Sequence, residues 1–139
     1  MDFKPETNLD QALAMAREDA NQSALFYDAF LNCDLIVPVR REGADQGSWK
    51  EVAADERFFP LFLKAQDTRV LPVFDRLDRL QSWAEEKELD YLKIRCHLFL
   101  KTLPPEISIA LNLGNAFYHF FNGEILEQLR QAAKPVMAQ

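Results

Sequence analysis

The sequence predicts an α+β domain, with a single mixed β-sheet of about five or six short strands and helices packed chiefly on one face. Apolar residues recur at helical spacing near both ends of the chain, short runs of branched and aromatic residues lie between them, and polar turns separate these runs. With 139 residues, 48% of them hydrophobic, the chain can fold around one core. We expect one domain over residues 1–139, with a core of about 8–133, loose ends and no second domain.

Two helices are predicted near the N-terminus. Asn8 is expected to cap the first, because Leu9 and Leu13 begin an apolar stripe at helical spacing. A second apolar pattern predicts a helix over residues 22–32. Asn21 separates the two helices in this interpretation, although one bent helix is also compatible with the pattern.

Three short apolar runs follow, over residues 35–39, 58–63 and 70–74, and each contains one proline. Their branched and aromatic residues predict a meander of strands, in which the last two runs form a hairpin. Proline has no N–H to donate, so each strand is interrupted, bulged or at a sheet edge there. The polar stretch over residues 41–57 is long for a hairpin loop, and it either is mobile or packs Trp49 against the fold.

Asp75 is expected to cap a third helix, whose polar residues, Arg79 among them, are expected to face solvent. The pattern then alternates between apolar and polar, which predicts a strand over 91–96 and a short helical turn over 97–103. A helix over 91–101 is the alternative, but it would carry apolar residues around most of its circumference. If the strand is parallel to its neighbour, the third helix makes a right-handed crossover to it.

The C-terminal part is predicted to contain two more strands, over residues 107–111 and 117–121. A last helix is predicted over residues 123–133, because apolar residues recur there at helical spacing. Asn122 directly precedes this helix and is expected to cap it.

The composition argues against several classes of function. The net charge is −6 and no basic cluster offsets it, so neither nucleic acid nor a membrane is an expected partner. The N-terminus has no apolar signal segment, which predicts a cytoplasmic protein. Cys33 and Cys96 could pair geometrically, but they are expected to be reduced, and no C-x-x-C motif is present. With only His97 and His119 beside them, we expect no metal site and no cofactor.

The order of these elements resembles the N-terminal domain of the SseB family of bacterial proteins. The matching segments span roughly residues 8–133: L-F-Y-D-A-F-L before L-I-V-P-V, V-L-P-V-F with a helix to Trp83, and I-A-L-N-L-G before the last helix. Leu113 stands where the family pattern leads us to expect proline, and the chain ends where many members continue into a second domain. The resemblance implies this fold and a bacterial cytosolic setting, and it provides no catalytic residues to transfer.

The segment N-L-G-N before the last predicted strand is the first candidate site. Gly114 and Asn115 tolerate a positive φ, which predicts a tight turn. Asn112, Gly114 and Asn115 could instead contact a ligand, with His97 or His119 as further polar groups. No phosphate-binding glycine loop and no serine nucleophile motif is present.

The aromatic run F-Y-H-F-F over residues 117–121 is the second candidate site. Alternation along a strand places aromatic side chains on both faces, so either the fold covers both faces or one is open to a partner. The candidate interface residues are Trp49, Phe58, Phe117, Tyr118 and Phe120.

These observations lead to two hypotheses about function. The leading one is a non-catalytic interaction or regulatory domain that binds a protein partner or itself. The missing catalytic motifs favour it, and we do not expect an enzyme. The rival is a small-molecule-binding or enzymatic domain with a pocket near residues 112–115.

Overall fold

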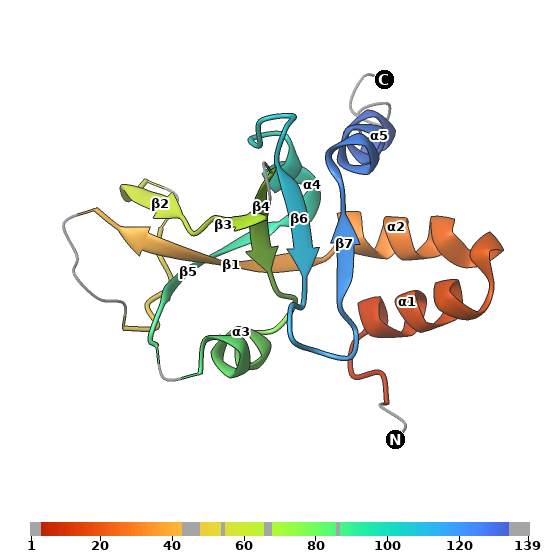
Figure 1. The fold of residues 1–139 in the computed structure, drawn as a ribbon, viewed down its shortest axis with the longest axis horizontal. Helices are drawn as coiled ribbons and strands as arrows, with labels where there is room; N and C mark the ends of the chain where they lie inside the picture. Colours follow the sequence, from red (N-terminus) through yellow and green to blue (C-terminus); the bar gives the residue numbers. More distant parts are fainter. Residues whose placement is uncertain (1–3, 43–47, 54, 66–67, 86, 134–139) are drawn as a thin grey trace.

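The structure, a computed structural model, describes residues 4–42, 48–53, 55–65, 68–85 and 87–133 (Figure 1). The helices α1 (Asn8–Glu18) and α2 (Ser23–Leu31) begin the chain, with the 3-10 helix η1 (Ala20–Gln22) between them. The strands β1 (Asp34–Arg41), β2 (Phe58–Pro60), β3 (Leu63–Ala65) and β4 (Thr68–Val73) follow. The remaining elements are α3 (Leu77–Ala84), β5 (Asp90–Arg95), α4 (Cys96–Leu100), β6 (Ser108–Leu111), β7 (His119–Phe121) and α5 (Gly123–Ala133). This content confirms the predicted α+β class and the two separate N-terminal helices.

The strands form two sheets, so the prediction of a single sheet was wrong. One sheet has the order β2-β1-β5, and the other has the order β3-β4-β6-β7. The predicted strand over residues 58–63 breaks after Pro60, so that β2 pairs with β1 whereas β3 pairs with β4. A bridge between Ile36 and Phe74 links the two sheets, with N···O distances of 2.6 and 2.9 Å. The expected meander is therefore divided between the sheets.

Strand β5 pairs antiparallel with β1, from Asp34 opposite Arg95 to Val39 opposite Asp90. Helix α3 therefore makes no parallel crossover to β5, and the parallel pair is β4 with β6. Strand β5 ends at Arg95 and α4 begins at Cys96, which confirms the prediction of a strand followed by a helical turn.

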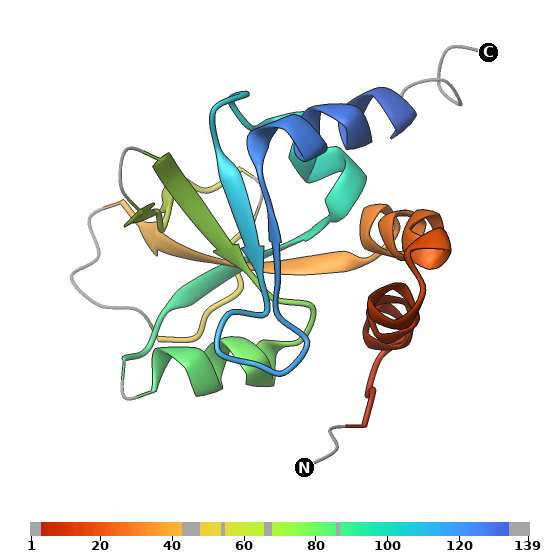
Figure 2. The same cartoon turned by 45° about the vertical axis from the view of Figure 1, so that its right-hand side comes forward.

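The core lies on both faces of β1, because successive side chains of a strand point to opposite faces. Val37 belongs to the larger buried cluster, which includes apolar residues of α1, α2, α4 and α5. Ile36 points the other way, into a smaller cluster with Phe74 and with Leu80 of α3. In Figure 2, α3 lies by itself below the strands, on the side away from α4 and α5. The helices α1, α2, α4 and α5 thus contribute to the larger cluster, and α3 contributes to the smaller one.

The second sheet is buried on both faces at β4 and β6, and its outermost strand β7 carries the exposed ring of Phe120. On one face, Leu71 and Phe121 belong to the larger cluster. Val70, Ser108 and Ala110 of the other face are 6%, 4% and 2% exposed. On the opposite face, Phe120 lies beside Ala110 of β6, which in turn lies beside Pro72 of β4. In Figures 1 and 2, β4, β6 and β7 stand in front of β1, and no helix of the described residues crosses their outer face.

The N-terminal cap of α1 is Thr7, so the prediction that Asn8 caps this helix was wrong. Thr7 Oγ1 accepts a hydrogen bond from the Asp10 amide at 3.0 Å, and the Asp10 carboxylate accepts one from the Thr7 amide at 3.3 Å. The Glu6 amide also donates to Asp10, at 2.9 Å. Glu6 and Thr7 are thus held in place, although we expected this end to be loose. Residues 1–3 and 134–139 lie outside the described part of the chain.

The other two predicted caps have different outcomes. Asn122 caps α5 as predicted, because its Oδ1 accepts from the Ile125 amide at 2.9 Å. Asp75 does not cap α3, since Arg76 occupies the N-cap position and makes no side-chain cap bond. The Asp75 carboxylate is used instead in the cluster described below.

Candidate functional site

The turn between β6 and β7 is built around Asn112, which directly follows β6. Asn112 is fully buried and has a φ of 55°, a left-handed conformation that asparagine tolerates better than most residues. Its amide donates to the Val73 carbonyl at 2.8 Å, and its carbonyl accepts from the Asn115 amide at 3.0 Å. Its side-chain Oδ1 accepts from the Asp75 amide at 3.2 Å. Asn112 therefore connects this turn to β4 and to the start of α3.

Gly114 and Asn115 complete the turn. Gly114 has a φ of 84°, and a Cβ built on it would lie 3.5 Å from Trp83 Cδ1, which is an ordinary contact. The backbone conformation, and not a lack of space, therefore favours glycine. Asn115 Oδ1 accepts from the Phe117 amide at 2.8 Å, so its side chain closes the turn locally. The segment is a turn, and its role in ligand binding stays a prediction.

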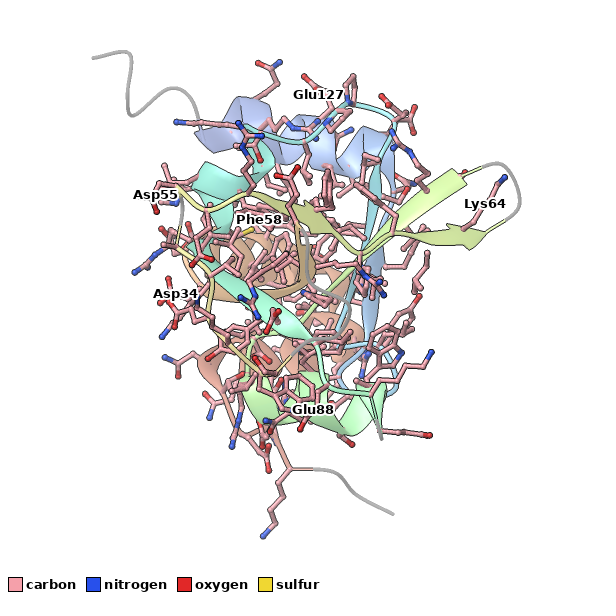
Figure 3. The ribbon with its side chains drawn as sticks, turned by 90° about the vertical axis from the view of Figure 1, so that its left-hand side faces the viewer. Asp34, Asp55, Phe58, Lys64, Glu88 and Glu127 are labelled. Carbon is pink, nitrogen blue, oxygen red and sulfur yellow. The ribbon has the colours of Figure 1, made fainter. Side chains whose placement is uncertain are left out.

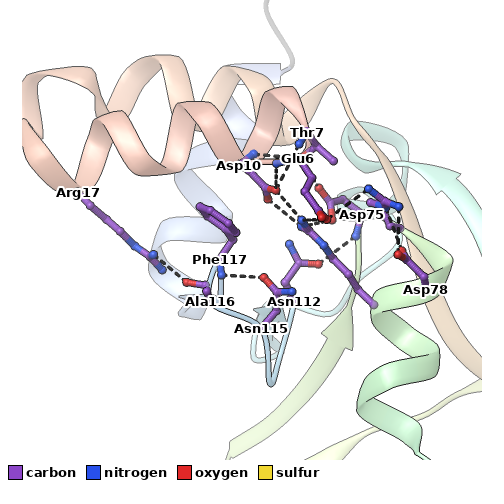
Figure 4. Close-up of polar contacts among 12 residues, drawn as sticks. Glu6, Thr7, Asp10, Arg17, Asp75, Asp78, Asn112, Asn115, Ala116 and Phe117 are labelled. Carbon is purple, nitrogen blue, oxygen red and sulfur yellow. Dashed lines mark hydrogen bonds and ion pairs between the residues drawn. The ribbon is translucent and has the colours of Figure 1, made fainter. Parts of the chain in front are cut away.

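The side chains of Glu6, Asp10 and Asp75 converge near this turn (Figure 4). A buried arginine binds all three carboxylates. Arg79 of α3 is only 6% exposed, so the prediction that it faces solvent was wrong. Arg79 Nη1 contacts Asp10 Oδ1 at 2.8 Å and Asp75 Oδ1 at 2.9 Å. Arg79 Nη2 contacts Asp10 Oδ2 at 2.5 Å and Glu6 Oε2 at 3.3 Å. These four residues, which we call the Arg79 cluster, join the N-terminal segment to α3.

Further contacts extend the Arg79 cluster to its neighbours. Thr7 Oγ1 donates to Asp75 Oδ2 at 2.8 Å, so the residue that caps α1 also holds the start of α3. The Cζ atom of Arg79 lies 5.9 Å from the centre of the Phe117 ring, within the range of a cation–π contact. The cluster therefore links α1, α3 and the segment that leads into β7.

The charges of the cluster stabilise one another. Burial by itself would raise the pKa of Asp10. The hydrogen bonds that Asp10 accepts from Arg79 and from the Glu6 and Thr7 amides, together with the positive charge of Arg79, outweigh burial and lower this pKa below its usual value. The hydrogen bond to Asp10 raises the pKa of Arg79, and burial only partly opposes this effect. Both groups therefore stay ionised at neutral pH, as an internal ion pair and not as a proton donor and acceptor.

Two surface hollows meet at the cluster. The first, of about 330 Å³, lies between α3 and the turn, and Trp83 is part of its lining. The second, of about 460 Å³, continues along Ala116 and Phe117. Both are lined by Glu6, Arg79, Gly114 and Asn115. Gly114 and Asn115 thus lie at a surface cleft, whereas Asn112 is buried in the interior.

Two buried N–H donors of this region have no hydrogen-bond acceptor among the described residues, Arg79 Nε and Asn112 Nδ2. A buried donor without an acceptor costs about 1–3 kcal/mol. Arg79 lines both hollows, so an acceptor oxygen bound there could satisfy its Nε donor, whereas Asn112 lines neither hollow.

The SseB protein N-terminal domain is the family whose sequence model matches this chain, over residues 9–128. The chain belongs to this family. The match runs from the first turn of α1 into α5, so it includes every strand described above. No curated protein and no solved structure matches the chain.

The two histidines of this SseB domain do not join the turn. His97 Nδ1 lies 3.1 Å from the Leu31 carbonyl, at the junction of α2 and α4. His119 packs edge-on against Phe26, with 5.0 Å between the ring centres, and burial together with Arg17 lowers its pKa. Neither histidine lines either hollow at the Arg79 cluster. None of the helices among the described residues is long and apolar enough to cross a membrane.

The five aromatic candidates of the SseB domain fall into two groups. Trp49 is half-buried against the smaller cluster, Phe58 is half-buried against the larger one (Figure 3), and Phe117 is buried in it. Tyr118 and Phe120 are 37% and 42% exposed. Only these last two offer a large part of their rings to a partner.

Sequence reasoning missed the Arg79 cluster and a second buried carboxylate, Asp90. Asp90 is 1% exposed and accepts hydrogen bonds from Arg41 Nε at 2.8 Å and from the Ser48 and Lys50 amides at 3.0 Å each. Asp90 thereby holds the segment around Trp49 against β5. The spacing T-x-x-D of the α1 cap was a readable signal for Asp10, but no local pattern marks Asp90.

Proposed function

We propose that this SseB domain is a non-catalytic interaction or regulatory domain that binds a protein partner or a second copy of itself through the outer face of β7. The observation that supports the proposal is the exposure of Tyr118, directly before β7, and of Phe120 on β7, the outermost strand of the four-stranded sheet, at 37% and 42%. The bacterial cytosolic setting that the family resemblance implies is part of the same proposal.

Aromatic rings at such a position suit binding. Tyrosine and phenylalanine are enriched in protein interfaces, because they bury a large area and lose few rotatable bonds. Phe120 and Phe121 are neighbours on the strand and point to opposite faces, and only Phe121 is buried. The apolar face that Phe120 presents is therefore not needed for the core.

The surroundings of Tyr118 suggest how a partner would bind. Arg17 of α1 donates to the Ala116 carbonyl at 2.9 Å and to the Tyr118 carbonyl at 2.5 Å. These contacts occupy backbone acceptors just before β7 and hold this segment in place, which lowers the entropy lost on binding. We expect the partner to contact the aromatic side chains and not to add a strand at this end of the sheet.

The test compares the exposed aromatic residues at β7 with an exposed aromatic residue on the other sheet. We replace Tyr118 and Phe120 together by serine, and as a matched control we replace Phe59, which is 59% exposed on β2 of the other sheet. Sedimentation equilibrium of the purified chain measures self-association. We expect the double variant to lose association and Phe59→Ser to keep it. Equal association in both variants would count against the β7 face.

A second candidate function is binding of a small molecule in the cleft beside the turn. The two hollows that share Gly114 and Asn115, and the unpartnered Nε donor of Arg79 in their lining, support this alternative. A metabolite panel in a thermal-shift assay tests it, because a ligand at a hundred times its Kd stabilises the fold by about 2.7 kcal/mol. Asn115→Ala should abolish the shift and Phe120→Ser should not. No shift with any compound removes the support for this candidate.

A further inference from the structure

Cys33 and Cys96 lie opposite each other at one end of the β1–β5 ladder. The last pair of that ladder is Asp34 with Arg95, and the next step along both strands reaches Cys33 and Cys96. The Cys96 amide donates to the Cys33 carbonyl at 2.9 Å, so the pairing continues to this step. The Cys33 amide donates instead to the Phe30 carbonyl at 3.3 Å, so one of the two bonds of an antiparallel pair is made here. A pair with both bonds has Cα atoms about 5.5 Å apart, and disulfides span Cα distances of roughly 4.4–6.8 Å.

The two side chains lie on the same face of the ladder. Cys96 is fully buried in the larger cluster, and Cys33 is half-buried against that same cluster. Cys33 follows α2 and Cys96 begins α4, so a bond between their sulfur atoms would join the ends of two helices. Cys33 also lines a surface hollow of about 490 Å³, so this residue borders the surface whereas Cys96 is buried.

The backbone around the pair is held in place on both strands. Arg95 Nε contacts Asp34 Oδ1 at 3.0 Å, and Arg95 Nη1 donates to the Asn32 carbonyl at 2.6 Å. One arginine therefore links the residues before and after Cys33 to the residue before Cys96. This arrangement keeps the two cysteines in register.

We propose that Cys33 and Cys96 are a redox modification site that forms a reversible intramolecular disulfide. The site is independent of the proposed interaction through β7. Its closing would fix the end of α2 to the start of α4 and would close the loop over residues 34–95 in the unfolded chain.

With hydrogen peroxide as the oxidant, the steps balance. The Cys33 thiolate attacks one peroxide oxygen, the O–O bond breaks, and the leaving hydroxide takes up a proton to become water. The Cys96 sulfur then attacks the sulfenic sulfur of Cys33, the S–O bond breaks, and a second water leaves. Two thiols are oxidised to one disulfide, and one peroxide is reduced to two waters.

The surroundings make the first step slow at neutral pH. Burial, and then the charges of Asp75 and Asp34, raise the pKa of Cys33 to about 12, while Arg95 partly opposes this shift. Lys93 is the other charged residue in the lining of the hollow. The thiolate is the reacting form, so the rate should rise about tenfold per pH unit in mildly alkaline solution. Burial likewise raises the pKa of Cys96, so the second step should also be faster in alkaline solution.

The test treats the reduced full-length chain with peroxide at several pH values and follows its intact mass and its free thiols. We expect the loss of two hydrogen atoms, no remaining thiol that can be alkylated, recovery with dithiothreitol, and a Tm several degrees above that of the reduced chain. Cys33→Ser and Cys96→Ser serve as matched controls, and neither should lose two hydrogens or gain Tm. An oxygen adduct on Cys33 with Cys96 still free, a disulfide between two chains, or two thiols that stay free would each overturn the proposal.

Discussion

The turn at residues 112–115 and strand β7 differ in how many of their side chains make contacts within the fold. The amide oxygen of Asn112 holds the start of α3, and that of Asn115 closes the turn. Phe120, only a few residues later, is 42% exposed and is not part of the core. The polar side chains proposed as a binding site are therefore used within the fold, whereas Phe120, one of the candidate interface residues, is exposed. Substitutions in the turn should therefore lower the free energy of unfolding, whereas substitution of Phe120 should lower binding and leave the fold stable.

The largest expected effect is loss of the Arg79 guanidinium. Arg79→Met leaves the carboxylates of Asp10 and Asp75, whose side chains are 0% and 4% exposed, without their charge partner. Removing one partner of a buried ion pair costs about 3–5 kcal/mol, which urea unfolding would measure. The control is Arg76→Met, because the Arg76 side chain is 42% exposed and its ion pairs should contribute less than about 1 kcal/mol. Equal losses in the two variants would show that the cluster is not an internal anchor.

Acid should weaken the contacts of two buried carboxylates, Asp10 in the Arg79 cluster and Asp90 beside Arg41, with a smaller effect than Arg79→Met. For Asp90, hydrogen bonds from Arg41 and from backbone amides outweigh burial, so its pKa is lowered, as is that of Asp10. The unfolded pKa of aspartate is about 3.9, so this stability is present above that pH and is lost as pH falls through the lower folded values. Urea unfolding from neutral to acidic pH checks this. Asp10→Asn should flatten the pH profile, and an unchanged slope would contradict the assignment.

Gly114→Ala should cost about 1–2 kcal/mol. The φ of 84° is unfavourable for alanine, while the space at this position accepts a Cβ. Thermal unfolding measures the loss, and binding through β7 should be unchanged. A neutral substitution would mean that the turn relaxes without cost.

The smallest effect on stability is expected at β7. Phe120→Ser should change the free energy of unfolding by no more than about 0.5 kcal/mol, because its ring is largely outside the core. A loss of several kcal/mol in urea unfolding would instead assign Phe120 to the fold.

The local features were readable from the sequence, and the long-range ones were not. Helical spacing and alternation predicted the elements, and Asn122 predicted its cap, because these depend on neighbouring residues. Pro60 signalled an interruption, but the division into two sheets depends on which distant strand each half meets. Arg79 and Asp10 are 69 positions apart, and on its own helix Arg79 is indistinguishable from a solvated residue.

The most direct measurement of the central claim is site-specific photo-crosslinking in the cells that produce the protein. A benzophenone side chain replaces Phe120 in one variant and Asn115 in another, so that β7 and the turn are compared under the same conditions. We predict a discrete protein adduct, either a partner or a second copy of the chain, from position 120 and none from position 115. An adduct only at 115, or equal adducts at both positions, would contradict the assignment of binding to β7.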